Sequence, residues 1–220
     1  MIKISPKSLN LYFECPLCFW LEKNKGLKRP SPYPFQLNLE VDNILKQDFD
    51  KHRQKGGSHP LLEANNIPAK LFQNQILLNE WRDNSKGLRY ENEDALLYGV
   101  LDDVLDFGDG KLAPFDYKTT GEKVPDIYDK FQLQMDIYTY LLEKNGYSTP
   151  KKAVLAFYII DKDNAFEGKL PFRKEIHVID TDSSYVEKTF KEAVRFLKKP
   201  APNEHKTECV FGKWLKQIND

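Results

Sequence analysis

Two aspartates and a lysine, Asp102, Asp116 and Lys118, have the side-chain types that a hydrolytic metal site requires. Two facing carboxylates repel each other unless one is protonated or a cation lies between them. Their hard oxygen atoms suit Mg²⁺ or Mn²⁺, which can clamp a phosphate oxygen and lower the pKa of a bound water. A nearby lysine could orient that water or offset charge in the transition state. If the fold brings them together, these residues predict phosphodiester hydrolysis.

A β-hairpin is predicted in the middle of the chain. β-rich runs from Tyr98 to Asp106 and from Leu112 to Tyr117 flank the turn sequence Gly108-Asp109-Gly110. Pro114 weakens the second strand locally, because proline cannot donate to a β-ladder and is typical of an edge strand or a bulge.

The loop length decides which residues face each other across this hairpin. A three-residue loop places Asp102 opposite Asp116, and directly opposed residues have Cβ atoms about 5 Å apart. Lys118 then points to the same face as Asp116, because side chains alternate along a strand. A two-residue loop would instead oppose Asp103 and Asp116. The alternative to a site is a surface hairpin whose charges are solvated.

Helices are expected to surround the hairpin. Ser5-Pro6 is typical of a helix start, and Pro16 is expected to end that first helix and open a second one. The segment Arg29 to Pro34 is expected to be a loop, because it contains three prolines. The remaining expected elements are an amphipathic helix over residues 37–49, a helix from Phe131 to Leu142, strands from Ala153 to Ile160 and from Arg173 to Ile179, and a closing helix from Tyr185 to Leu197. This order predicts an α/β fold with a mixed sheet flanked by helices.

Composition narrows the class of protein. The 220 residues carry 33 basic and 33 acidic side chains, so any electropositive surface must be local. Mean hydropathy is −0.61, and no apolar run approaches the ~20 residues needed to cross a bilayer. The start of the chain lacks the apolar stretch of a signal peptide. We therefore expect a soluble cytoplasmic protein with no membrane association, folded as one domain over residues 1–220, with a helical segment to about residue 85 and a core from about 86 to 200.

Three motifs in order resemble the PD-(D/E)XK nuclease superfamily, most closely its RecB-like branch, which includes CRISPR-associated exonucleases. They are Gly99-Val100-Leu101-Asp102, then Asp116-Tyr117-Lys118-Thr119, then Gln134 followed four residues later by Tyr138. The opening segment from Ser5 to Pro16 also resembles that branch. The resemblance implies a restriction-endonuclease-like mixed sheet flanked by helices.

The resemblance also implies roles for these residues. The implied catalytic residues are Asp102, Asp116, Lys118, Gln134 and Tyr138. Asp102 and Asp116 would bind the metal, and the backbone carbonyl of Tyr117 would complete its shell. Gln134 and Tyr138 would position the lysine or contact DNA, and their i,i+4 spacing puts both on one helix face.

Two features depart from the branch. Asp42 stands where the branch usually carries a histidine, so it is either a third carboxylate ligand or an ordinary polar position on its helix. His52 and His59 are weaker substitutes, because they fall near the helix end or in the following loop.

The cysteines are the second departure. Cluster-bearing members of the branch use four cysteines, whereas this chain has only Cys15, Cys18 and Cys209. Gly212 stands where another cysteine could be, and His205 could supply a fourth ligand for iron or for zinc. We expect no iron–sulfur cluster, with the cysteines acting as small buried residues.

The sequence thus predicts a Mg²⁺- or Mn²⁺-dependent deoxyribonuclease for DNA repair, recombination or defence, working with a helicase or another partner. The alternative is a catalytically inactive nucleic-acid-binding or interaction module on the same fold. Candidate DNA contacts are basic or aromatic: Lys7, Lys23, Lys25, Lys28, Arg29, Lys188, Lys191, Arg195, Lys198, Lys199, Tyr12, Phe13 and Trp20.

Overall fold

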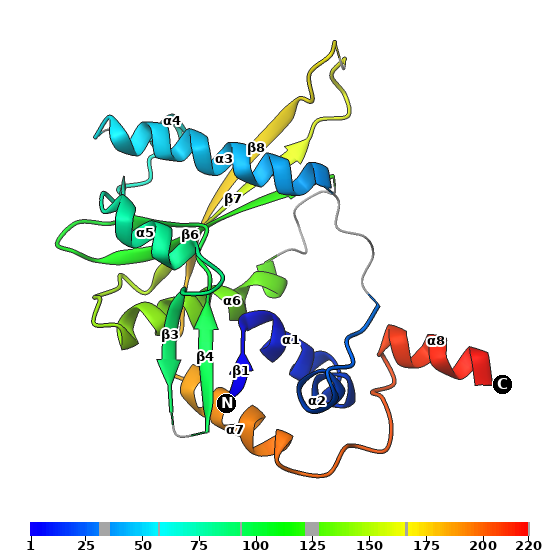
Figure 1. Ribbon diagram of the computed structural model, residues 1–220. Coiled ribbons are helices and arrows are strands. Elements are labelled where there is room, and N and C mark those ends of the chain that lie inside the picture. Colours follow the sequence, from blue (N-terminus) through cyan, green and yellow to red (C-terminus); the bar gives the residue numbers. More distant parts are fainter. Residues whose placement is uncertain (31–35, 57, 93, 122–127, 166, 220) are drawn as a thin grey trace. The chain divides into compact units, whose positions relative to one another are not determined.

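The computed structural model describes residues 1–30, 36–56, 58–92, 94–121, 128–165 and 167–219 (Figure 1). It divides into two compact units. The terminal unit comprises residues 1–33, 90–98 and 184–220, and the central unit comprises residues 34–89 and 99–183. These boundaries differ from a division near residue 85, because the two ends of the chain fold together in one unit.

The described part of the chain is mainly helical toward both ends and mainly strand in the middle. The helices are α1 (Pro6–Glu14), α2 (Pro16–Lys25), α3 (Gln36–Gln54), α4 (Pro60–Ala64), α5 (Gln75–Arg82), α6 (Tyr128–Lys144), α7 (Val186–Leu197) and α8 (Val210–Asn219). The strands are β1 (Ile2–Ile4), β2 (Lys70–Leu71), β3 (Leu88–Glu91), β4 (Ala95–Gly99), β5 (Asp103–Asp106), β6 (Leu112–Thr120), β7 (Lys152–Ile160) and β8 (Phe172–Asp180). None of the described helices is long and apolar enough to cross a membrane.

The central unit contains a mixed five-stranded sheet in the order β2-β5-β6-β7-β8. β6 and β7 run parallel, with α6 in the connection between them, and the other neighbouring pairs are antiparallel. This arrangement confirms the predicted α/β class with a mixed sheet flanked by helices. β7 is buried along nearly its whole length, as its continuous apolar sequence predicts.

The two faces of this sheet carry different chemistry. On one face, the ring of Phe49 from α3 stacks on Tyr117 with 4.8 Å between centroids, and Figure 1 shows α3 lying across this part of the sheet. On the other face, Phe131 from α6 lies 6.1 Å from Phe157 of β7. Because side chains alternate along a strand, Asp116 points to the α6 face while its neighbour Tyr117 points to the α3 face.

The hairpin between β5 and β6 has the three-residue loop. Asp103 pairs with Phe115, and the backbone N–H of Phe107 donates to the carbonyl of Lys111 at 2.9 Å. All three loop residues have positive φ, which suits the sequence Gly108-Asp109-Gly110. The pair Asp103–Phe115 rules out the two-residue register, and Asp102 lies one residue before this last pair of the ladder.

An edge position is wrong for β6 as a whole, because β6 lies inside the sheet between β5 and β7. At Pro114 itself, however, β6 pairs with β5 and not with β7, so the local weakening of the ladder is confirmed. The proline is tolerated there because β7 pairs with β6 only from Phe115 onward.

The continuous strand expected from Tyr98 to Asp106 is also wrong. The chain instead forms β4 and β5, which belong to different sheets. Gly99 lies at the interruption, where a Cβ atom would stand 2.8 Å from side-chain atoms of both Tyr138 and Leu141 on α6. The missing side chain therefore lets α6 approach the segment that leads to Asp102.

The terminal unit contains a second sheet in the order β1-β4-β3. α1 begins as predicted, with the N–H of Ser8 donating to Ser5 Oγ at 3.2 Å, and α2 begins at Pro16. The prediction that the helix from Tyr185 to Leu197 closes the fold is wrong, because α8 follows it. The helical segment predicted before residue 85 also contains the short strands β1 and β2. Most of the proline-rich loop, residues 31–34, lies outside the described residues.

Candidate active site

Asp116 is the buried centre of the predicted site. Its side chain is 2% exposed, on the α6 face of β6. Gln134 Nε2 from α6 donates to its Oδ1 at 3.3 Å, and Lys118 forms an ion pair with its Oδ2. The carboxylate thus has one amide donor and one ammonium partner, and it lies close enough to Asp102 for the two to repel. Carboxylate oxygens in such a pair are suitable ligands for a cation.

Asp102 is held in place by contacts to the backbone around it. Arg82 of α5 donates from Nε to the Asp102 carbonyl at 2.7 Å, and the hydroxyl of Tyr138 donates to the carbonyl of Val100 at 2.7 Å. The carboxylate Oδ1 of Asp102 lies 3.0 Å from Lys46 Nζ. The segment between β4 and β5 is thus fixed by two helices and by a charged partner.

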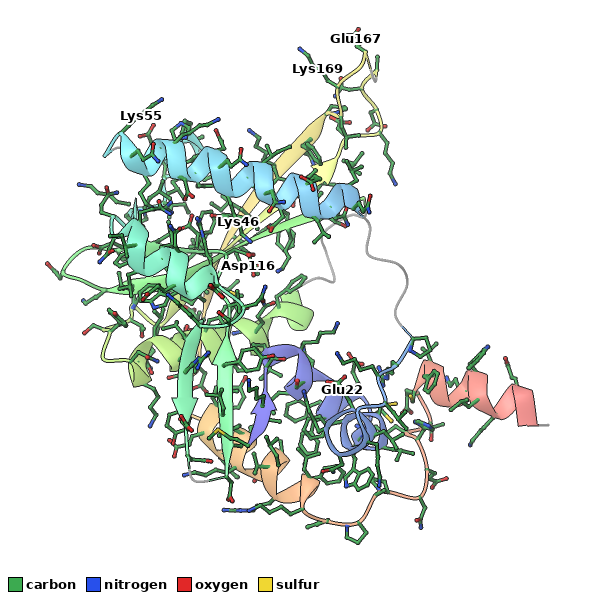
Figure 2. All side chains as sticks on the ribbon, viewed as in Figure 1. Glu22, Lys46, Lys55, Asp116, Glu167 and Lys169 are labelled. Carbon is green, nitrogen blue, oxygen red and sulfur yellow. The ribbon has the colours of Figure 1, made fainter. Side chains whose placement is uncertain are left out.

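Lys46 is a site residue that the sequence reasoning missed. Its ammonium group lies 2.8 Å from Asp42 Oδ2, one helical turn earlier on α3, as well as 3.0 Å from Asp102. Figure 2 shows Lys46 and Asp116 in the same region of the central unit. The i,i+4 spacing of Asp42 and Lys46 was the available signal.

Asp42 is therefore connected to Asp102 only indirectly, because the Lys46 ammonium group lies between the two carboxylates. Among the described residues, Asp42, Asp102 and Asp116 do not form a set whose oxygens all lie within 4.8 Å of one another. Its role as a third metal ligand stays a prediction.

Gln134 and Tyr138 lie together, as their spacing predicts. Gln134 Nε2 donates to the Tyr138 hydroxyl at 2.8 Å. One end of this pair contacts Asp116, and the other contacts the carbonyl of Val100. α6 therefore links β6, which carries Asp116, to the segment between β4 and β5, which carries Asp102.

The charges of the site act strongly on one another. Burial, reinforced by the neighbouring Asp102 carboxylate and partly opposed by Lys118, raises the pKa of Asp116 to about 7. Burial acts against the charged form of Lys118, but Asp116 and Asp102 outweigh it and raise the lysine pKa above its ordinary value. Asp102 and Asp116 repel each other when both are ionised, and a divalent ion bound by both carboxylates would remove that repulsion.

The expected role of Tyr117 concerns its backbone carbonyl and stays a prediction. Its side chain is buried on the α3 face, where the hydroxyl donates to Asp103 Oδ2. Burial and the charge of Asp103 raise the tyrosine pKa well above its ordinary value.

A buried ion-pair network beneath the site was not predicted. Asp103 is fully buried and pairs with Arg53 and, at 3.1 Å, with Arg82 Nη2. Arg82 also binds both carboxylate oxygens of Asp50, at 2.8 and 2.9 Å. Asp103 is thus satisfied by arginines, and Arg82 connects this network to Asp102.

His52 and His59 lie in a separate group with Asp48. His59 caps α4, since its Nδ1 accepts from the N–H of Leu61 at 3.1 Å, and its Nε2 lies 3.1 Å from Asp48 Oδ2. Burial lowers the pKa of His59, helped by the charges of His52 and Lys174 and opposed by Asp48. Both ring nitrogens are engaged, so this histidine acts in the structure of the α3–α4 connection.

Several of the basic residues predicted to contact DNA have acidic partners. The ion pairs are Arg29 with Glu14 at 2.7 Å, Lys191 with Glu187 at 2.6 Å, and Lys198 with Asp94 at 2.7 Å. Tyr12 packs against Phe19 and Phe196, with ring centroids 5.3 and 5.2 Å apart. These contacts favour structural roles for the residues concerned.

The candidate site thus places Asp116 and Lys118 on β6 of a mixed sheet, with Asp102 beside them and α6 contacting Asp116 through Gln134. The family model for the PD-(D/E)XK nuclease superfamily matches residues 36–211, and the chain belongs to this superfamily. A comparison with curated proteins found no match.

Proposed function

We propose that this protein is a divalent-metal-dependent nuclease that hydrolyses phosphodiester bonds in DNA. The supporting observation is a pair of neighbouring carboxylates: Asp116 is buried beside Asp102, and burial together with the Asp102 charge, partly opposed by Lys118, raises the pKa of Asp116 to about 7. Two carboxylates that repel each other are costly to keep ionised, and a site for a cation gives a reason for keeping both. Membership of a nuclease superfamily supports the same reading.

Asp102 and Asp116 would hold Mg²⁺ or Mn²⁺, together with the carbonyl of Tyr117. When bound, such an ion supplies charge stabilisation at the phosphate and a water of lowered pKa. Lys118 offers a compact positive charge beside the scissile group. Gln134 orients the Asp116 carboxylate, and Tyr138 is a positioning residue that holds the backbone before Asp102.

Lys46 gives the site a second internal cation. In the metal-free protein Lys46 balances Asp42 and Asp102, while Lys118 balances Asp116. A divalent ion held by Asp102 and Asp116 would compete with Lys46 and Lys118 for these carboxylates, which would let both ammonium groups contact phosphate oxygens. This exchange of partners would couple metal binding to substrate binding.

The three motifs and their spacing favour a RecB-like enzyme of DNA repair, recombination or defence, acting with a helicase or another partner protein. A second candidate is a nucleic-acid-binding module without catalysis. The position of Lys46 between Asp42 and Asp102 favours that alternative, because an ammonium group there neutralises carboxylates without a metal.

A cleavage assay separates the two functions. End-labelled single-stranded DNA, double-stranded DNA and RNA are incubated with the protein in Mg²⁺, Mn²⁺ or Ca²⁺. We expect cleavage of DNA in Mg²⁺ or Mn²⁺, and a loss of at least ~10²-fold in Asp102→Asn and Lys118→Met. The matched controls are Asp180→Asn and Lys152→Met, which change an ion pair of 2.7 Å between β8 and β7.

Wild-type activity that survives Lys118→Met would contradict the proposed site. Absence of cleavage in every metal, together with salt-sensitive DNA binding, would support the inactive module instead.

A further inference from the structure

Four metal-binding side chains from the two ends of the chain meet in the terminal unit. Cys15 and Cys18 lie at the junction of α1 and α2, and His205 and Cys209 lie just before α8. Their ligand atoms all lie within 4.8 Å of one another. We propose that these four residues bind a single zinc ion, which is separate from the proposed nuclease site and does not depend on it.

The distances match those around one tetrahedral ion. His205 Nδ1 lies 3.4 Å from Cys15 Sγ, 3.3 Å from Cys18 Sγ and 3.8 Å from Cys209 Sγ. The sulfurs of Cys18 and Cys209 are 3.8 Å apart. A zinc ion with tetrahedral Zn–S and Zn–N bonds sets sulfur–sulfur separations of about 3.8 Å and sulfur–nitrogen separations of about 3.6 Å.

Hydrogen bonding does not account for this arrangement. The Nδ1 atom of His205 carries either one proton or one lone pair, yet three sulfurs surround it. Thiols are weak donors and weak acceptors, so three such contacts would contribute little stability. A shared ion gives each of the four atoms a strong bond.

The same distances argue against an iron–sulfur cluster. In a four-iron cluster each ligand binds a different iron, and in a two-iron cluster the ligands divide between two irons. Either arrangement separates at least some of the ligand atoms by metal atoms and bridging sulfides. Four ligand atoms that all lie within 4.8 Å of one another surround one ion.

Two residues around the four ligands, Arg29 and Gly212, also fit a metal site. Arg29 Nη2 donates to Cys209 Sγ at 3.5 Å, and the N–H of Gly212 donates to the same sulfur at 3.3 Å. Donors of this kind offset the negative charge of thiolate ligands and orient them. Gly212 also leaves room for the histidine, because a Cβ atom there would stand 2.5 Å from the Cβ of His205. Glycine at this position is thus what allows His205 to enter as the fourth ligand.

Zinc would join α1 and α2 to the segment before α8, which are about 190 residues apart in sequence. Binding to a folded site contributes directly to folding free energy, because the unfolded chain has no preformed site. We therefore expect the ion to stabilise the terminal unit.

Elemental analysis of the native protein tests this proposal without any substitution. The untagged protein is purified without chelators from cells supplied with both iron and zinc. We expect one zinc per chain and a colourless protein, with zinc released when a mercurial reagent titrates the thiols. Iron with visible absorbance would overturn the proposal, and so would a folded protein free of both metals.

Variants identify the ligands. Cys209→Ser should lose most of its zinc, whereas His205→Cys should keep it in an all-sulfur site, and His177→Gln on β8 serves as the control. Cobalt added to the zinc-free protein should give the absorption of tetrahedral thiolate coordination in wild type and lose its charge-transfer intensity in Cys209→Ser. Equal zinc content in Cys209→Ser and wild type would refute the assignment. If the serine variant does not fold, the stoichiometry of the native protein still decides.

Discussion

Replacing Asp116 with asparagine should make the metal-free protein more stable while abolishing its activity. Burial raises the pKa of Asp116 from its ordinary 3.8 to about 7. At 1.36 kcal/mol per pKa unit, keeping this carboxylate ionised in the folded state costs about 4 kcal/mol. Asparagine has the same shape without the charge, so Asp116→Asn should gain a large part of that free energy, on the order of 2–4 kcal/mol above pH 7.

The sign of the pH dependence follows from the direction of this pKa change. Between pH 3.8 and about 7, the folded protein keeps a proton on Asp116 that the unfolded chain has released. Wild-type stability therefore falls relative to Asp116→Asn as pH rises through this interval, and the difference is constant above it. Added Mg²⁺ should reduce the difference, because an ion that binds only the folded wild type stabilises it by mass action.

Urea unfolding of both proteins from pH 5 to 8.5, in buffers freed of divalent ions but without chelator, measures this difference. Asp180→Asn is the matched control, because Asp180 pairs with Lys152 on an exposed part of the sheet. The reasoning is refuted if wild type at pH 8 is as stable as Asp116→Asn, or if their difference does not change with pH.

Three further predictions concern the residues that support the site. Arg82→Met should destabilise the protein by about 3 kcal/mol in the same unfolding assay, because it leaves the buried Asp103 with fewer charged partners; a change within experimental error would contradict this. The folded pKa of His59 lies below its ordinary 6.5, so wild-type stability should fall as pH drops below 6.5. In His59→Asn this fall should be smaller, because asparagine can cap α4 but does not titrate. Parallel pH profiles of stability for the two proteins would contradict this prediction. Gly99→Ala should lower the cleavage rate more than substrate affinity, because its methyl group would displace Tyr138; unchanged kinetics would show that the close approach is not needed.

The hairpin was predictable because it depends on neighbours in sequence, whereas its register was left open between loops of two and three residues. The structure has the three-residue loop Gly108-Asp109-Gly110, with Asp103 paired with Phe115. The starts of α1 and α2 were predictable for the same reason, since a capping serine and first-turn prolines act within one helical turn. These features need no knowledge of the rest of the fold.

The break between β4 and β5 was not predictable, because it depends on α6. The residues from Tyr98 to Asp106 have a continuous preference for strand, and only the close packing of Tyr138 and Leu141 against Gly99 shows why the chain changes sheets. Lys46 and Arg82 were missed for a similar reason. Each reaches Asp102 from a helix; the i,i+4 spacing of Lys46 from Asp42 indicates only that local pair, and nothing in the sequence connects Lys46 or Arg82 to Asp102.

By itself, the sequence determined which chemical groups are present: two aspartates, a lysine, three cysteines and a histidine. The periods of strands and helices also determined which residues close in sequence lie on the same face of a strand or helix. Tertiary structure alone decided which groups from distant segments meet, how deeply Asp116 is buried, and that the ligand atoms of His205 and the three cysteines lie within 4.8 Å of one another. The physical reason is range. Propensity and capping act over a few residues, whereas burial, charge pairing and ligand geometry depend on the packing of the folded chain.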